Sequence, residues 1–175
     1  MAAYYAAPIY FANMAPVITK KILPSLVKPI DFGKTWKGKP ILGKNKTFRG
    51  LVMGVVFGII ITLLQYRFYG FESFRMISIF DYKLGISILL GALMGFGAMF
   101  GDMFESFFKR RIGIESGKPW IPFDQIDFIV FGLLFSFIIF IPPITYMIII
   151  LIISPLGHIA INHLAFYLKI RKEKW

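Results

Sequence analysis

The chain has 175 residues, of which 57% are hydrophobic, and its mean hydropathy is +0.70. This composition is typical of an all-α polytopic membrane protein, which we expect to form a single domain over residues 1–175. The lack of cysteine excludes disulfides, thiolate catalysis and Cys-based metal sites. The net charge of +11 is explained more simply by basic loops on the cytoplasmic side of a membrane than by nucleic-acid binding, so we expect no nucleic-acid partner.

Five apolar segments follow one another along the chain and are predicted to be transmembrane helices. They cover residues 2–19, 50–66, 84–108, 124–141 and 144–168. The first is short and contains Pro8 and Pro16, but no basic region precedes it, which argues against a signal peptide. Pro142 and Pro143 separate the last two segments in a turn without charge.

The basic residues are divided unequally between the connections. Seventeen of the 20 Lys and Arg residues lie in loop 20–49, in loop 109–123 or in the C-terminal tail, whereas three lie between residues 67 and 83. The positive-inside rule therefore predicts an outside N-terminus, with both basic loops and the C-terminus in the cytoplasm. The protein is expected in the cell membrane.

Two sets of glycines predict close contacts between helices. Gly50, Gly54 and Gly58 are spaced four residues apart in the second segment, a spacing more typical of helix packing in lipid than of a ligand site. Gly91, Gly95, Gly97 and Gly101 would let another element approach the third segment.

The candidate chemistry lies in residues 101–127, which hold five of the nine acidic residues. Asp102, Glu105, Ser106 and Lys109 occupy positions i, i+3, i+4 and i+7, which form one face of a helix. Asp124 and Asp127 are expected to make a second acidic face on a helix that begins after Pro122.

The depth of these acids favours a cation site. Asp102 and Glu105 are expected roughly 6–10 Å inside the membrane, where an ionised carboxylate is costly unless it is paired or bound to a cation. A Glu105–Lys109 pair would satisfy Glu105 but would leave Asp102, Asp124 and Asp127 without partners. Hard oxygen ligands without Cys or His favour Mg²⁺. A purely structural ion-pair network is the alternative.

The basic residues near these acids have two possible roles. Lys109, Arg110, Arg111 and Lys118 are either anchors that contact anionic headgroups or clamps for a triphosphate, and the residues alone favour neither. In the first loop, Thr47 is expected to cap the second helix, whose amide end suits an anion. His158 and His163 are left out of the site.

The acidic and basic residues of 101–127 resemble the signature of a known family. Gly101-Asp102, Ser106-x-x-Lys109-Arg110, Lys118 and Asp124-x-x-Asp127 are similar to the signature of the phosphatidate cytidylyltransferases (CDP-diacylglycerol synthases), and most closely to that of their small archaeal relatives, the CDP-archaeol synthases. Asn45-Lys46-Thr47-x-x-Gly50 resembles their N-K-T-W-E-G element. The chain departs from the pattern where Trp120-Ile121-Pro122 replaces H-G-G, at Gln125 in place of Arg, and at Arg49 in place of Glu.

The resemblance implies a reaction and a set of roles. CTP and an isoprenoid glycerol phosphate, 2,3-bis-O-geranylgeranyl-sn-glycerol 1-phosphate, would give a CDP-lipid and pyrophosphate. Asp102, Asp124 and Asp127 would hold one or two Mg²⁺ ions, with Glu105 as an outer or bridging ligand, and Lys109 would join the three aspartates in catalysis. The implied substrate contacts come from Asn45, Lys46, Thr47, Ser106, Lys109, Arg110 and Lys118. A monovalent cation is a further candidate cofactor, and an oligomer is compatible with the sequence.

The main competing hypothesis is an ion transporter or channel lined by carboxylates. It predicts acids near the bilayer centre and a repeat between the two halves of the chain. Here the acids gather at one face and no repeat is visible. The pattern of the CDP-alcohol phosphotransferases is also absent, so a metal-dependent cytidylyltransferase is favoured.

Overall fold

The computed structural model describes residues 1–19 and 27–167, and its regular elements there are helices and one short hairpin. The elements are α1 (Ala2–Ile18), β1 (Thr35–Trp36), β2 (Lys39–Pro40), α2 (Phe48–Phe68), α3 (Glu72–Met76), α4 (Leu84–Arg111), the 3-10 turn η1 (Phe123–Gln125), α5 (Asp127–Ser136) and α6 (Ile144–Tyr167). Part of the predicted first loop and the tail, residues 20–26 and 168–175, lie outside the described residues.

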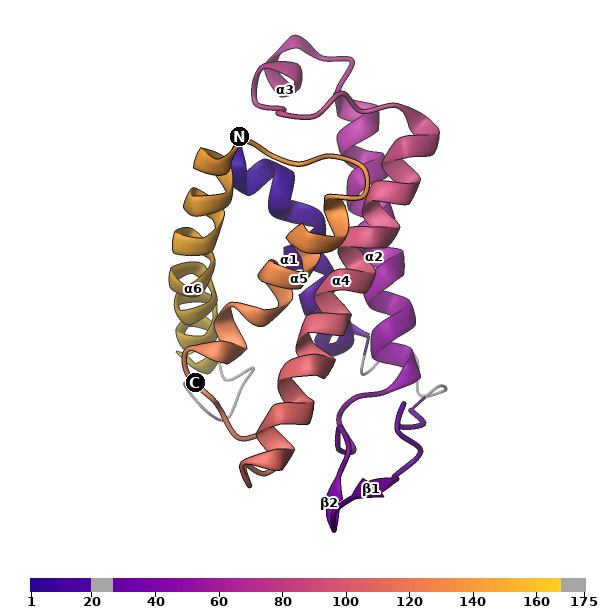
Figure 1. The fold of residues 1–175 in the computed structure, drawn as a ribbon. Coiled ribbons are helices and arrows are strands. Elements are labelled where there is room, and N and C mark those ends of the chain that lie inside the picture. The colour runs from indigo at the N-terminus through magenta and orange to yellow at the C-terminus, as the bar shows by residue number, and fades with distance from the viewer. Residues whose placement is uncertain (20–26, 168–175) are drawn as a thin grey trace.

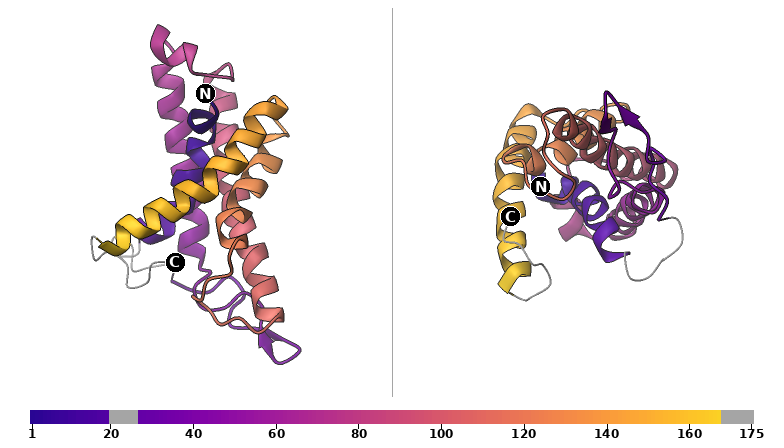
Figure 2. Two further views of the ribbon diagram at one scale, coloured as in Figure 1. Left: turned by 90° about the vertical axis from the view of Figure 1, so that its left-hand side faces the viewer. Right: turned by 90° about the horizontal axis from the view of Figure 1, so that it is seen from below.

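Successive long helices run in opposite directions, which separates the connections into two groups (Figure 1). The hairpin and the segment after α4 lie at the lower end of the view, whereas α3 lies at the upper end. The described part of the basic loops is thus brought to one end of the molecule. Helix α6 crosses the other helices obliquely at the side of the bundle (Figure 2).

Two helices in the described residues, α2 and α4, are long and apolar enough to cross a bilayer, and they contain the predicted segments 50–66 and 84–108. Helix α1 is continuous despite its two prolines. The fourth segment differs from the prediction, because the continuous helix expected over 124–141 is replaced by η1 and the ten-residue helix α5. Ten residues span only about 15 Å, half of a typical hydrocarbon core.

The core lies between α1, α4 and α5, where Ile9, Leu90, Met94 and Ile129 are fully buried. Glycines bring the backbones of α2, α4 and α5 close together, as the sequence predicted. A Cβ atom on Gly95 would lie 2.6 Å from the carbonyl oxygen of Gly54. These contacts fix the position of α4, which carries the first acidic face.

Candidate active site

The C-terminal half of α4 carries the first acidic face as predicted. Because α4 is continuous to Arg111, Asp102, Glu105, Ser106 and Lys109 project from successive turns. Glu105, Ser106 and Lys109 are buried, whereas Asp102 is partly exposed. The helix therefore places acids one to two turns before its basic end, where Lys109 to Arg111 are also favourable for the helix dipole.

Asp127 approaches this face from α5, and the approach depends on a glycine. A Cβ atom on Gly101 would lie only 2.5 Å from the carbonyl oxygen of Asp127, so a larger residue would push the start of α5 away. As a result, one carboxylate oxygen from each of Asp102, Glu105 and Asp127 lies within 4.8 Å of the others. We call these three residues the acidic trio.

The acidic trio has the donor set of a divalent-cation site. Its potential ligands are carboxylate oxygens alone, which match the preference of Mg²⁺. Three acids this close, with Glu105 only 5% exposed, need positive charge nearby to remain ionised. The residues thus fit the expected metal.

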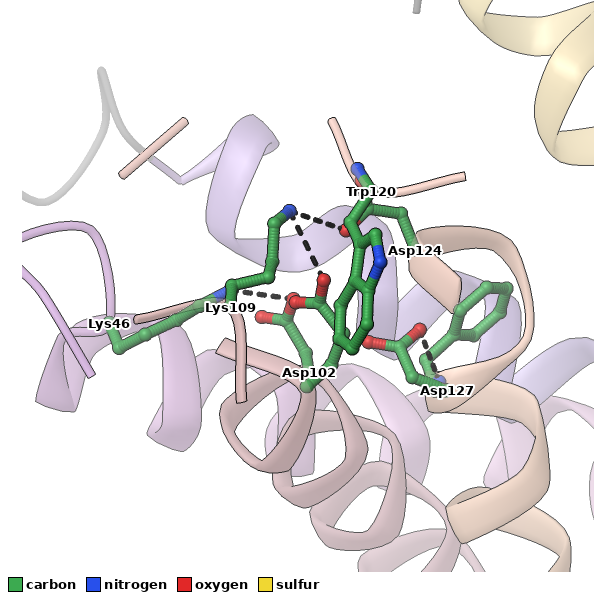
Figure 3. Close-up of polar contacts among 8 residues, drawn as sticks. Lys46, Asp102, Lys109, Trp120, Asp124 and Asp127 are labelled. Atoms are coloured by element: carbon green, nitrogen blue, oxygen red, sulfur yellow. Dashed lines mark hydrogen bonds and ion pairs between the residues drawn. The ribbon is translucent and has the colours of Figure 1, made fainter. Parts of the chain in front are cut away.

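Two lysines provide part of that charge (Figure 3). The Nζ of Lys46 lies 2.6 Å from Asp102 Oδ1, and the Nζ of Lys109 lies 3.1 Å from Glu105 Oε1 and 2.7 Å from Asp124 Oδ1. The Glu105–Lys109 pair predicted from the sequence is present. The expectation that it leaves Asp102 and Asp124 without partners is wrong, because Lys46 reaches across from the first loop and Lys109 bridges two acids.

Asp124 and Asp127 do not form the single helical face that their spacing predicted. Asp124 lies in η1, whereas α5 begins at Asp127. The Oδ2 of Asp124 accepts a hydrogen bond from the backbone N–H of Trp120 at 2.6 Å, while its Oδ1 faces Lys109. Asp124 therefore orients Lys109 beside the acidic trio, and its role as a metal ligand stays a prediction.

The first loop is organised by Asp31. Its Oδ2 accepts hydrogen bonds from the N–H groups of Leu42 and Gly43, at 2.8 and 3.0 Å, and its Oδ1 accepts one from Gly33. Burial by itself would raise the pKa of Asp31, but these three backbone donors outweigh it and lower the pKa below its ordinary value. This bonding holds the chain just before Lys46.

The remaining predicted residues of the first loop lie at the same end of the molecule. Thr47 caps α2, as predicted, by accepting a hydrogen bond from the N–H of Gly50 at 3.2 Å. Asn45 is exposed and lies beside Gly117 in the second loop. A small cavity of about 30 Å³ lies between Asn45, Lys46, Thr47 and Asp102.

The predicted basic contacts of the second loop are split. Arg110 is buried, and its guanidinium lies next to Gly43 of the first loop, together with Ser116. Lys118 is exposed in a turn closed by a hydrogen bond from its N–H to the carbonyl of Glu115, and within the described residues no ion pair joins it to the acids. The structure thus brings Arg110 to the loop–loop contact and leaves Lys118 at the surface.

An apolar cavity that the sequence pattern did not reveal adjoins the acidic trio. It has a volume of about 430 Å³, and Glu105 and Asp127 lie on its wall. Its other lining residues are mainly aromatic or aliphatic: Phe104, Phe108, Trp120, Pro122, Phe123, Ile126, Val130 and Phe131. The phenylalanines at 104 and 108 are one turn apart on α4, which is a local signal of this surface. The site therefore joins a charged end to an apolar wall.

Known proteins share both the sequence and the fold. A family model described as CarS-like CDP-archaeol synthase matches residues 1–175. The CDP-archaeol synthase of Thermococcus onnurineus is 36% identical over 177 residues, covering 98% of this chain and 94% of that protein. That of Methanococcus maripaludis strain C7 is 39% identical over 175 residues, covering 99% and 95%. A solved structure of an intramembrane enzyme for archaeal membrane lipid biosynthesis has a TM-score of 0.75 and 28% identity, covering 92% of each chain.

Proposed function

The chain belongs to the CDP-archaeol synthase family, and from this premise we propose that the acidic trio and its two lysines form the centre of its reaction. The enzyme transfers CMP from CTP to an archaeal lipid phosphate and releases pyrophosphate. The observation that carries the proposal is the convergence of Asp102, Glu105 and Asp127 with Lys46 and Lys109 beside an apolar cavity. The charged groups proposed to bind phosphate and metal thus lie next to the apolar surface proposed to bind the lipid.

The reaction needs no protein nucleophile. A phosphate monoester has a second pKa of about 6, so the lipid phosphate is largely a dianion at neutral pH. One of its oxygens attacks the α-phosphorus of CTP, and the bond from that phosphorus to the bridging oxygen of pyrophosphate breaks. The protein must bring together two anions, align them and stabilise the leaving pyrophosphate. The absence of cysteine is consistent with this chemistry.

We assign metal binding to the acidic trio, with Asp124 as a further ligand to be tested. Mg²⁺ bound there would neutralise phosphate charge and polarise phosphoryl oxygens. Because Mg²⁺ is usually held by one or two carboxylates together with substrate phosphates, three close acids are sufficient. We propose that one or two Mg²⁺ ions bind there, with a monovalent cation as a further cofactor.

We assign phosphate binding to the basic residues that surround the trio. Lys46 and Lys109 have their ammonium groups beside the acids, and Arg110 lies where the two loops meet. Ser106 is on the same face of α4 as the acids, and Lys118 would approach from the surface. Asn45 and Thr47 flank Lys46 and are proposed to contact CTP.

The lipid is proposed to occupy the apolar cavity with its phosphate toward Glu105 and Asp127. The aromatic lining suits isoprenoid chains, which can remain in the bilayer while the headgroup reacts. We further propose that the chain crosses the cell membrane five times as one domain, residues 1–175, with an outside N-terminus and a site that faces the cytoplasm. The fourth crossing is then made by η1, α5 and the residues up to 141 and not by one long helix. The separation of basic loops from residues 69–83 in Figure 1 supports that orientation.

The proposed site can be tested with purified protein, CTP, Mg²⁺ and a geranylgeranyl glycerol phosphate. We expect pyrophosphate and a CDP-lipid in the wild type, and loss of at least about 100-fold in kcat/KM in Asp127→Asn because charge stabilisation is lost. Asp81→Asn is the matched control, since Asp81 is an exposed acid paired with Lys83 outside the site. Wild-type rates in Asp127→Asn with unchanged Mg²⁺ binding would refute the assignment.

A further inference from the structure

The hairpin in the first loop has a well-defined local structure. Strands β1 and β2 pair antiparallel, and the two residues between them, Lys37 and Gly38, have φ angles of 51° and 74°. Two successive positive φ angles are typical of a type I′ turn, which suits the twist of a tight hairpin. The hairpin ends at Pro40, four residues before Lys44 and five before Asn45. Its position therefore determines where the proposed substrate-binding part of the loop begins.

The side chain of Arg111, the last residue of α4, binds the backbone carbonyl groups of this hairpin. Its Nη1 donates a hydrogen bond to the carbonyl oxygen of Trp36 at 2.7 Å, and its Nη2 donates to the carbonyl oxygens of Lys39, at 3.2 Å, and Pro40. The contact is reciprocal, because Lys39 Nζ donates to the carbonyl oxygen of Arg111 at 2.9 Å. A planar guanidinium can serve several acceptors at once, which a lysine ammonium cannot do in the same geometry.

Aromatic rings complete the clamp. The ring of Trp36 stacks on that of Phe107 with centroids 5.6 Å apart and an angle of 19°. The Arg111 guanidinium carbon lies 5.3 Å from the Trp36 centroid and 5.1 Å from the Phe107 centroid, within the range of cation–π attraction. Trp36 is half exposed, so this stack is a contact at the surface and not part of the buried core.

Two of the contacts between the first loop and α4 differ in character. One is the ion pair between Lys46 and Asp102, which involves proposed reaction residues. The other is the Arg111 clamp, which involves none of them. The cavity beside Lys46 is small, with a volume of about 30 Å³. To bind a phosphate of CTP, the Lys46 ammonium must leave the carboxylate of Asp102.

We propose that Arg111 is a positioning residue for the CTP site. This inference rests on the proposed function. When Lys46 leaves Asp102 for a phosphate, the clamp keeps the hairpin on the end of α4, so that Asn45, Lys46 and Thr47 remain opposite the acidic trio. Without the clamp, the hairpin would have to dock on the end of α4 again each time CTP binds. Arg111 itself touches neither the acidic trio nor the apolar cavity in the contacts described.

The test separates binding from chemistry. In Arg111→Gln we expect the KM for CTP to rise about tenfold, with kcat within about threefold of wild type and the KM for the lipid unchanged, because ordering the loop is added to CTP binding. Arg111→Lys keeps the charge and one donor group, so its KM for CTP should lie between that of wild type and that of Arg111→Gln. Arg75→Gln is the control, since Arg75 is an exposed arginine that pairs with Glu72 and lies outside the first loop and α4.

Hydrogen exchange provides a readout that does not depend on turnover. Amides of residues 35–47 should exchange faster in Arg111→Gln than in wild type, and CTP should restore their protection only at higher concentration. An unchanged KM for CTP, or an equal fall in kcat and kcat/KM, would overturn the positioning role. If the wild type bound CTP and showed this protection but released no pyrophosphate, the proposed function would fail while the clamp remained supported.

Discussion

Lys109 shows why pair rules based on spacing describe only part of a site. The i,i+4 relation to Glu105 was visible in the sequence, and the structure has that contact. The shorter contact, however, is with Asp124, which is 15 residues away and reaches Lys109 through the turn that begins at Trp120. One buried ammonium thus joins α4 to the segment that leads into α5. Its position depends on tertiary structure as much as on the helix.

Asp31 leads to a prediction on stability and pH. Its folded pKa is below the ordinary value, so its stabilising effect is present above the unfolded pKa of about 3.9 and is lost as pH falls through the folded pKa. In Asp31→Asn an NH₂ group replaces one of the two carboxylate oxygens, so at least one backbone N–H loses its acceptor. We expect this to lower the free energy of unfolding by about 1–3 kcal/mol at pH 7. Thermal unfolding in detergent should show the difference at pH 7 and a smaller one once the pH falls below the lowered pKa of Asp31. A constant difference across that range would contradict this account.

At the scale of elements, the position of α5 depends on Gly101. Gly101→Ala would place a methyl group 2.5 Å from the carbonyl oxygen of Asp127, so the start of α5 must move and Asp127 must leave the acidic trio. Since misplacement of a reacting group by about 1 Å can cost 100-fold in rate, we expect a loss of roughly that size in kcat/KM.

Gly85→Ala is the matched control for this prediction. Gly85 lies in the same helix, and a Cβ atom there meets nothing within 4 Å. It should keep wild-type activity and unfold at the same or a slightly higher temperature, because alanine favours helix more than glycine does. Activity assays and thermal unfolding of both variants check the prediction. Equal activity in Gly101→Ala and Gly85→Ala would show that the close approach of α5 is not required.

The elements also show what the sequence could predict about the site and what it could not. The face of α4 follows from helical spacing, and the glycine contacts follow from their periodicity, because both are local patterns. The turn from Trp120 to Gln125 does not, since a carboxylate that accepts a backbone N–H four residues earlier leaves no periodic signal. The Lys46–Asp102 pair and the Arg111 clamp could likewise not be predicted from the sequence, because each joins residues more than 50 positions apart.

For the molecule as a whole, the departure from the family pattern at Trp120 to Pro122 now has a structural role. The ring of Trp120 lies 4.3 Å from that of Phe123, centroid to centroid, and both residues line the apolar cavity. The backbone N–H of Trp120 meanwhile fixes Asp124. This segment thus contributes an apolar wall on one side and orients an acid on the other, next to the proposed reaction centre.

The orientation in the membrane can be tested directly because the chain has no cysteine. Arg75 and Lys34 are exposed residues on connections at opposite ends of the molecule, so single cysteines there should be tolerated. With a membrane-impermeant maleimide on intact cells, we expect Arg75→Cys to be labelled and Lys34→Cys to be labelled only after permeabilisation. Labelling of both in detergent is the control for thiol reactivity. Labelling of Arg75→Cys only from the cytoplasmic side would contradict the five-span orientation, and with it the cytoplasmic access of CTP to Asp102 and Lys46.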